Sequence, residues 1–203
     1  MPRTDPIAHD RVWTVPNVLS VLRLLALPVF AWLVLDRQQD GWAALLLAVA
    51  GLSDNLDGYI ARRFDQVSRL GQLLDPVVDR VQVVVALVVL VVAGALPWYL
   101  AAVLVLREAV LAGTLVALRR RGFGSLPVHY LGKIGTFATV ASFPLLLLGH
   151  GRHVAPPLAA VGTVGGAGFL YWGLALYWCA GAVYVWQARR LLRTVPAVRT
   201  RRA

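Results

Sequence analysis

The chain has few charged residues and almost no cysteine. Charged residues make up 15% of its 203 residues, whereas an ordinary soluble domain carries about 25%. A soluble domain of this length has too much surface for its volume to hide the 59% of residues that are hydrophobic. The single cysteine, Cys179, excludes a disulfide framework and a cysteine-rich metal site within one chain. The composition therefore excludes a disordered chain, a fibrous repeat and a soluble enzyme.

Long apolar runs dominate the sequence instead, and they predict an all-α integral membrane protein with six transmembrane helices. About 20 mostly apolar residues cross a bilayer as a helix. Five spans are expected at Asn17–Leu35, Gly41–Arg62, Gly71–Gly94, Pro97–Leu118 and Gly132–Gly149. The last uncharged run, Val154–Ala188, is long enough for one span or two. We interpret residues 1–203 as a single membrane domain with a basic N-terminal arm (1–15) and a basic C-terminal tail (189–203).

Glycine and proline mark two local features of these runs. Gly94 and Pro97 predict a tight turn between the third and fourth helices. The glycine-rich stretch from Gly162 to Gly168 is apolar and uncharged, so it predicts close helix packing and no phosphate-binding loop.

The charge is strongly positive, with 20 basic and 10 acidic residues and a formal net charge of +10. Six spans place most of the basic residues, including those of both chain ends, on one side of the membrane. The positive-inside rule therefore predicts one span in the last run and both termini in the cytoplasm. We expect the charge to contact anionic lipid head groups and expect no nucleic-acid partner.

Four aspartates lie on the second and third predicted helices, on either side of a polar connection. Residues three and four positions apart share a helix face, so two antiparallel helix ends are expected to present these carboxylates to each other. The aligned positions are Asp54, Asp57, Gly58, Ala61 and Arg62 on one helix and Gly71, Asp75 and Asp79 on the next. The alternative is a solvated, charged loop that joins two helices.

Carboxylates just inside a membrane need compensating charge. Ligands that are all oxygen favour Mg²⁺ or Mn²⁺ over Zn²⁺, and two such ions could clamp the oxygens of a phosphoryl displacement. The glycines and the alanine leave room for a nucleotide, and Arg62 could bind a phosphate as a planar fork.

The spacing D-x2-D-G-x2-A-R-x8-G-x3-D-x3-D resembles the signature of the CDP-alcohol phosphotransferase family. The resemblance implies that an alcohol hydroxyl attacks the phosphorus of a CDP-alcohol and that CMP leaves. It implies a homodimer in a bacterial cytoplasmic membrane, with the active site on the cytoplasmic side. It also implies roles by position: Asp54, Asp57, Asp75 and Asp79 at two metal ions, Asp79 as general base, and Gly58, Ala61, Arg62 and Gly71 at the CDP site, Ala61 through packing.

The acceptor is less sharply indicated than the reaction. The family resemblance implies CDP-diacylglycerol as donor, and the segment Thr14–Phe30 is similar to the start of phosphatidylglycerophosphate and cardiolipin synthases of this family. A phosphate-bearing acceptor suits the nearby cations, so we expect glycerol 3-phosphate first, then phosphatidylglycerol, with inositol phosphate as an alternative. Candidate acceptor-binding residues are Asn17, Arg23, Arg107 and Lys133.

Three of these residues also have a structural interpretation. Asn17 could cap a helix, Arg23 could extend toward the membrane surface, and Arg107 could pair within the bundle. A different class, an ion-coupled transporter, would also hold charges inside six spans. It would place them near the midplane and often in two related halves, and the sequence shows neither feature.

Overall fold

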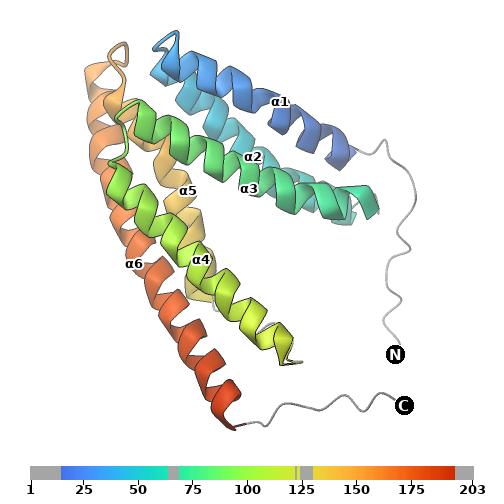
Figure 1. Ribbon diagram of the computed structural model, residues 1–203. Coiled ribbons are helices and arrows are strands. Elements are labelled where there is room, and N and C mark those ends of the chain that lie inside the picture. The colour runs from blue at the N-terminus through green and yellow to red at the C-terminus, as the bar shows by residue number, and fades with distance from the viewer. Residues whose placement is uncertain (1–14, 64–68, 122, 124–129, 195–203) are drawn as a thin grey trace. The chain divides into compact units, whose positions relative to one another are not determined.

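In the computed structural model, the described residues form six helices, which Figure 1 traces in chain order: α1 (Val15–Leu35), α2 (Asp40–Arg63), α3 (Arg69–Val92), α4 (Trp98–Arg120), α5 (Tyr130–His150) and α6 (Pro156–Thr194). The structure describes residues 15–63, 69–121, 123 and 130–194, and within the helices the side chains of 15–16, 54–63, 69–76 and 193–194 lie outside the described residues. No strand occurs in the described ranges, so the predicted all-α class is confirmed.

Each predicted span corresponds to one helix. The ambiguous last run forms a single continuous helix, α6, in place of two short ones. α6 continues to Thr194, so the predicted tail at 189–203 begins as a helix. Four helices are long and apolar enough to cross a membrane, namely α1, α4, α5 and α6, and α2 contributes a shorter apolar stretch, Asp40–Ser53. The chain is therefore a membrane protein, and the count of six spans stays a prediction.

The predicted turn between α3 and α4 is confirmed. Gly94 has a φ of +80°, which is accessible to glycine but costly for other residues. The backbone N–H of Gly94 donates to the carbonyl of Val91, and that of Leu96 to the carbonyl of Leu90, both at 3.1 Å. Pro97 then precedes α4 with a φ of −60°, so this proline ends the turn without removing a helical hydrogen bond.

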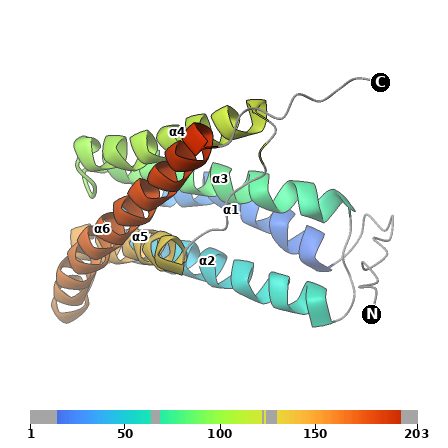
Figure 2. The ribbon, with the colours of Figure 1, turned by 90° about the horizontal axis from the view of Figure 1, so that it is seen from below.

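The helices group into two compact units. The first contains α1, α2 and α3 with residues 140–166, which are the end of α5 and the start of α6. The second contains α4 with residues 130–139 of α5 and 167–194 of α6. In the first unit α1 packs against both α2 and α3, and Figures 1 and 2 show the three helices side by side.

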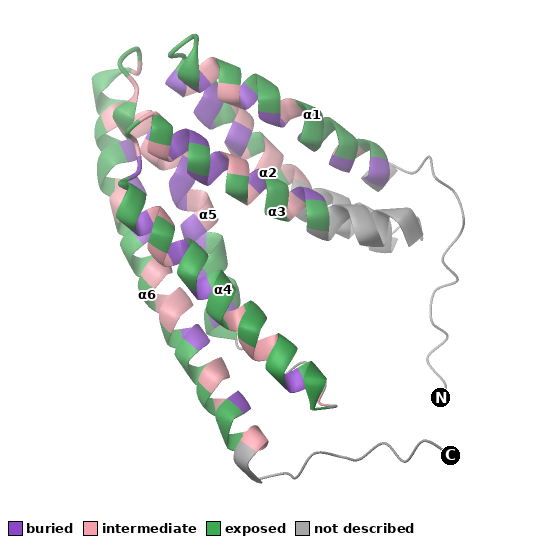
Figure 3. Ribbon diagram, in the orientation of Figure 1, coloured by how far each residue is buried: buried purple, intermediate pink, exposed green. Residues whose placement is uncertain are grey.

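The core of the first unit is apolar and contains Phe30, Leu90, Phe143 and Leu147, all fully buried. Figure 3 shows such buried residues recurring along the inner sides of the helices. Many large apolar side chains elsewhere on the helices are exposed, including Trp42, Val92 and Trp172. Such an apolar outer surface is what a lipid-facing protein requires.

Glycines let α5 and α6 approach closely. A Cβ atom on Gly149 would lie 2.6 Å from the backbone nitrogen of Thr163, and one on Gly166 would lie 2.9 Å from that of Leu146. Real Cβ atoms do not approach backbone atoms so closely. The sequence predicts that the segment from Gly162 to Gly168 serves helix packing. This prediction is confirmed at Gly166 and at Gly162, which lies against Gly149.

Candidate active site

The predicted carboxylate site lies on α2 and α3. The backbone is helical at Asp54 and Asp57 on α2 and at Asp75 and Asp79 on α3. The predicted helical backbone at these four positions is therefore confirmed, and the shared face of each pair stays a prediction from the spacing. The side chains of residues 54–76 lie outside the described residues, and so does the connection 64–68. The contacts of Asp54, Asp57, Gly58, Ala61, Arg62, Gly71 and Asp75 thus stay predictions.

Asp79 is the member of this set whose side chain is described, and it pairs with an arginine of α1. The Nη1 group of Arg23 donates a hydrogen bond to Oδ1 of Asp79 at 2.8 Å. The Arg23 side chain is 3% exposed, whereas that of Asp79 is 46% exposed. A buried charge is stable only with a partner, so Asp79 compensates Arg23, and the Asp79 side chain stays partly exposed.

The packing of α1 against α3 accounts for this pair. Asn17, Ser20 and Arg23 are buried and share one face of α1, which continues as the apolar Leu27 and Phe30. The inward face of α1 is therefore polar in its first turns and apolar beyond them. Asn17 lies inside α1, which begins at Val15, so it is not the cap of that helix. Arg23 turns inward, which contradicts the interpretation that it extends to the membrane surface.

One buried polar residue near this pair escaped the sequence analysis. Gln82 is 8% exposed and lies three positions after Asp79, which is the spacing of one helix face. The spacing could have indicated it, because Asp75, Asp79 and Gln82 follow one another at intervals of four and three residues. The motif itself ends at Asp79, one turn before Gln82.

A second charged cluster lies in the other unit and joins α4 to α6. Arg107 is buried, its Nη1 donates to Oε1 of Glu108 at 2.9 Å, and its Nε donates to the backbone carbonyl of Tyr177 at 3.4 Å. The guanidinium also stacks 3.6 Å from the centre of the Tyr177 ring, and the Tyr177 hydroxyl donates to Glu108. The pairing of Arg107 with Glu108 within the bundle is therefore present. Acceptor binding by Arg107 stays a prediction.

The remaining candidate, Lys133, is exposed on the first turn of α5. It belongs to the same unit as Arg107, whereas Asn17, Arg23 and Asp79 belong to the first unit. The structure thus places Asn17 and Arg23 on one face of α1, where Arg23 contacts Asp79 of α3. No contact between Arg107 and Lys133 occurs among the described residues.

The donor chemistry of the predicted site fits a hard divalent cation. All four aspartates offer oxygen, and the two helices hold them at intervals that put each pair on one face. Asp79 keeps a partly exposed carboxylate beside its ion pair. Among the side chains that the structure describes, no group of three His, Cys, Asp or Glu residues forms a metal site, since three of the four predicted ligands fall outside that part of the chain.

Comparison with known proteins identifies a matching family and several similar proteins. The family model described as CDP-alcohol phosphatidyltransferase matches residues 13–186. A "Cardiolipin synthase (CMP-forming)" of Streptomyces coelicolor is 48% identical over 92% of this chain and 88% of its own length. A "Putative cardiolipin synthase" of Mycobacterium bovis is 42% identical over 96% of this chain and 92% of its own length.

A relative whose name states a different activity is also similar. The "CDP-diacylglycerol--glycerol-3-phosphate 3-phosphatidyltransferase" of Cereibacter sphaeroides is 34% identical over 84% of this chain and 90% of its own length. The matched region includes α1 to α5 and most of α6, so the similarity covers both helical units.

Proposed function

Because the chain belongs to the CDP-alcohol phosphatidyltransferase family, we propose that it transfers the phosphatidyl group of CDP-diacylglycerol to phosphatidylglycerol, forming cardiolipin and releasing CMP. The observation that carries this choice of acceptor is the 48% identity, over nearly the whole chain, to a protein named as a CMP-forming cardiolipin synthase. The sequence alone ranked glycerol 3-phosphate before phosphatidylglycerol, and the higher identity to cardiolipin synthases reverses that order in our proposal.

The reaction exchanges a phosphoanhydride bond for a phosphate ester bond. A free hydroxyl of the glycerol head group attacks the phosphorus that carries diacylglycerol, an O–P bond forms, and the bond from that phosphorus to the CMP oxygen breaks. Phosphoryl transfer depends mainly on positioning and on neutralising charge. In our proposal Asp79 accepts the proton of the attacking hydroxyl, since a general base must reach that oxygen.

The other residues of the site have positioning and binding roles in this proposal. Arg23 holds Asp79 through the 2.8 Å ion pair, so it fixes the orientation of the base. Gly58, Ala61, Arg62 and Gly71 line the CDP site. Two Mg²⁺ or Mn²⁺ ions held by Asp54, Asp57, Asp75 and Asp79 would neutralise the phosphate charge. Asn17, Arg107 and Lys133 are the further candidates for contact with the acceptor.

The proposed setting is a bacterial cytoplasmic membrane. The basic ends of α4 and α6, with Arg119, Arg120 and Arg189 exposed, support a cytoplasmic position for that side. We propose that six helices cross the bilayer, that both termini and the carboxylate site face the cytoplasm, and that the enzyme works as a homodimer. The small residues of the spans would permit such an association.

A second acceptor, glycerol 3-phosphate, is favoured by the 34% identity to a glycerol-3-phosphate phosphatidyltransferase. Inositol phosphate, the third acceptor considered from the sequence, gains no support from the relatives described above. Membership of the family sets the transporter alternative aside.

The test is release of CMP by the purified protein in detergent with CDP-diacylglycerol and Mg²⁺. Phosphatidylglycerol, glycerol 3-phosphate and inositol phosphate are added in separate reactions. We expect CMP and cardiolipin with phosphatidylglycerol, and loss of both in Asp79→Asn. The matched control is Asp36→Asn, because Asp36 is an exposed aspartate paired only with its neighbour Arg37 among the described contacts. Release with glycerol 3-phosphate alone would refute the proposed acceptor and leave the family reaction intact.

A further inference from the structure

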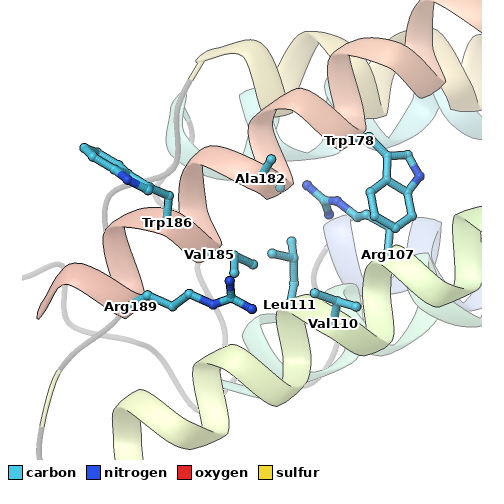
Figure 4. Close-up of a pocket in the computed structure, with 9 residues that line it drawn as sticks. Arg107, Val110, Leu111, Trp178, Ala182, Val185, Trp186 and Arg189 are labelled. Carbon is cyan, nitrogen blue, oxygen red and sulfur yellow. The ribbon is translucent and has the colours of Figure 1, made fainter. Parts of the chain in front are cut away.

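A groove runs between α4 and α6 within the second unit. Its volume is about 310 Å³, at the lower end of the range for small-molecule pockets. Figure 4 shows Val110 and Leu111 of α4 facing Ala182 and Val185 of α6 across it. These walls are apolar, so the middle of the groove suits a hydrocarbon chain and not a polar head group.

An arginine lies at each end of the groove, and the two differ in how their charge is compensated. Arg107, at the inner end, pairs with Glu108 and stacks on Tyr177. Arg189, at the other end, is exposed, and no acidic partner for it occurs among the described side chains. The inner end is therefore electrically neutral as a cluster, whereas the outer end presents a cation that has no acidic partner among the described side chains.

The outer end lies at the basic edge of the unit. The Nη1 of Arg121, just past the end of α4, donates to the backbone carbonyl of Leu192 at 3.0 Å, which ties the ends of α4 and α6 together. Arg189 lies one turn before Leu192. Gly181 lies beside Arg107 and comes eight residues before Arg189, which is about 12 Å along a helix. The groove thus runs inward from the level of the arginines into the apolar part of the two helices.

An amphipathic side chain marks the same outer level. Trp186 lines the groove and is 60% exposed, and tryptophan prefers the boundary between head groups and hydrocarbon. Arg190 lies over its ring at 5.7 Å. A phosphate at this level, with an apolar chain extending inward, would match both the charge and the polarity of the groove.

We infer that the groove between α4 and α6 binds one acyl chain of an anionic phospholipid, whose net negative head group pairs with Arg189. The site takes its ligand from the surrounding membrane and does not depend on which acceptor the enzyme uses. Phosphatidylserine is a suitable probe because it is anionic and is neither donor, acceptor nor product in the proposed reaction. Phosphatidylcholine with the same acyl chains tests the requirement for net negative charge.

The experiment counts lipids retained by the purified full-length protein in native mass spectrometry. We expect phosphatidylserine to be retained more than phosphatidylcholine. In Arg189→Gln this preference should fall about fivefold, since one basic residue near a membrane contributes about 1 kcal/mol. Arg190→Gln is the matched control: it removes the same charge one position away, from a residue that does not line the groove, and should change the preference less.

A second variant tests the apolar part of the site. Ala182→Trp fills the groove from an exposed position of α6 and should lower the retention of both lipids. If this variant does not fold, Val110→Trp is used in its place, because it fills the groove from α4. Equal effects of Arg189→Gln and Arg190→Gln would overturn the inference in favour of diffuse surface charge. Equal retention of the two lipids by the wild type would also overturn the inference. Loss of a dimer in Ala182→Trp would overturn it as well, because a second copy of the chain would then cover the groove.

Discussion

The ion pair between Arg23 and Asp79 gives the candidate site a feature that can be tested at one residue. If Arg23 positions the base, Arg23→Gln should lower kcat about 10²-fold, the effect of a misplacement of roughly 1 Å, with little change in KM for either substrate. Arg23→Lys should restore part of the activity, because a lysine retains the charge but not the planar fork. Steady-state CMP release with each substrate varied in turn measures both constants.

The same experiment decides between the two roles considered for Arg23. If Arg23 binds the acceptor phosphate, the KM for the acceptor should rise and kcat should change less. Arg37→Gln is the control, because Arg37 is exposed and pairs with the adjacent Asp36 at 3.6 Å. A wild-type rate in Arg23→Gln would contradict both roles.

At the scale of elements, the contact of α5 with α6 depends on glycine. A Cβ on Gly162 would lie 2.7 Å from the carbonyl oxygen of Leu145. Gly162→Leu should therefore destabilise the protein by about 1–3 kcal/mol through overpacking, seen as a lower unfolding temperature in detergent. Gly168→Leu is the matched control: it gains the same helix propensity on the same helix, and nothing lies within 4 Å of its Cβ position. Equal stability of the two variants would refute this account of the packing.

The start of α2 lies against the connection between α5 and α6. A Cβ on Gly151 would lie 3.0 Å from Cβ of Asp40, which is itself buried. Burial raises the pKa of Asp40 above its ordinary value of 3.8, although the nearby His150, His153 and Arg152 lower it in part. The folded state therefore holds this proton more tightly than the unfolded chain does.

This shift predicts how stability depends on pH. Between pH 3.8 and the raised pKa, the unfolding free energy contributed by Asp40 falls as pH rises, and above the raised pKa the loss is complete. Asp40→Asn should therefore raise the unfolding temperature at pH 7, and the gain should shrink as the pH approaches 3.8. Unfolding scans across this range test it, with the exposed Asp36→Asn as control; a lower unfolding temperature of Asp40→Asn at pH 7 would contradict the prediction.

At the scale of the whole molecule, a metal site would join α2 to α3. Removal of divalent ions with EDTA should reduce CMP release to background, and Mg²⁺ or Mn²⁺ should restore it, since the predicted ligands are all carboxylates. Binding to the folded state also raises stability, so Mg²⁺ should raise the unfolding temperature of the wild type and have less effect on Asp79→Asn. Full activity in EDTA would contradict metal dependence.

The sequence predicted the helices well because apolar runs and their interruptions are local features. The predicted second span, Gly41–Arg62, differs from α2 by one residue at each end. The partners of charged residues were not predictable in the same way. Arg23 and Asp79 are 56 positions apart, and the stacking of Arg107 on Tyr177 depends on how two helices cross. Such contacts are set by packing, which periodicity does not encode.

The length of α6 has a consequence for the lipid environment. Its 39 residues extend about 58 Å at 1.5 Å per residue, whereas the hydrocarbon layer is about 30 Å thick. The helix must incline strongly or project beyond that layer. Either arrangement is a response to hydrophobic mismatch between the length of the helix and the thickness of the bilayer. The rate of the reconstituted enzyme should then vary with the acyl-chain length of the host lipid, so that membrane thickness acts as a physical control on a protein that helps to make the membrane.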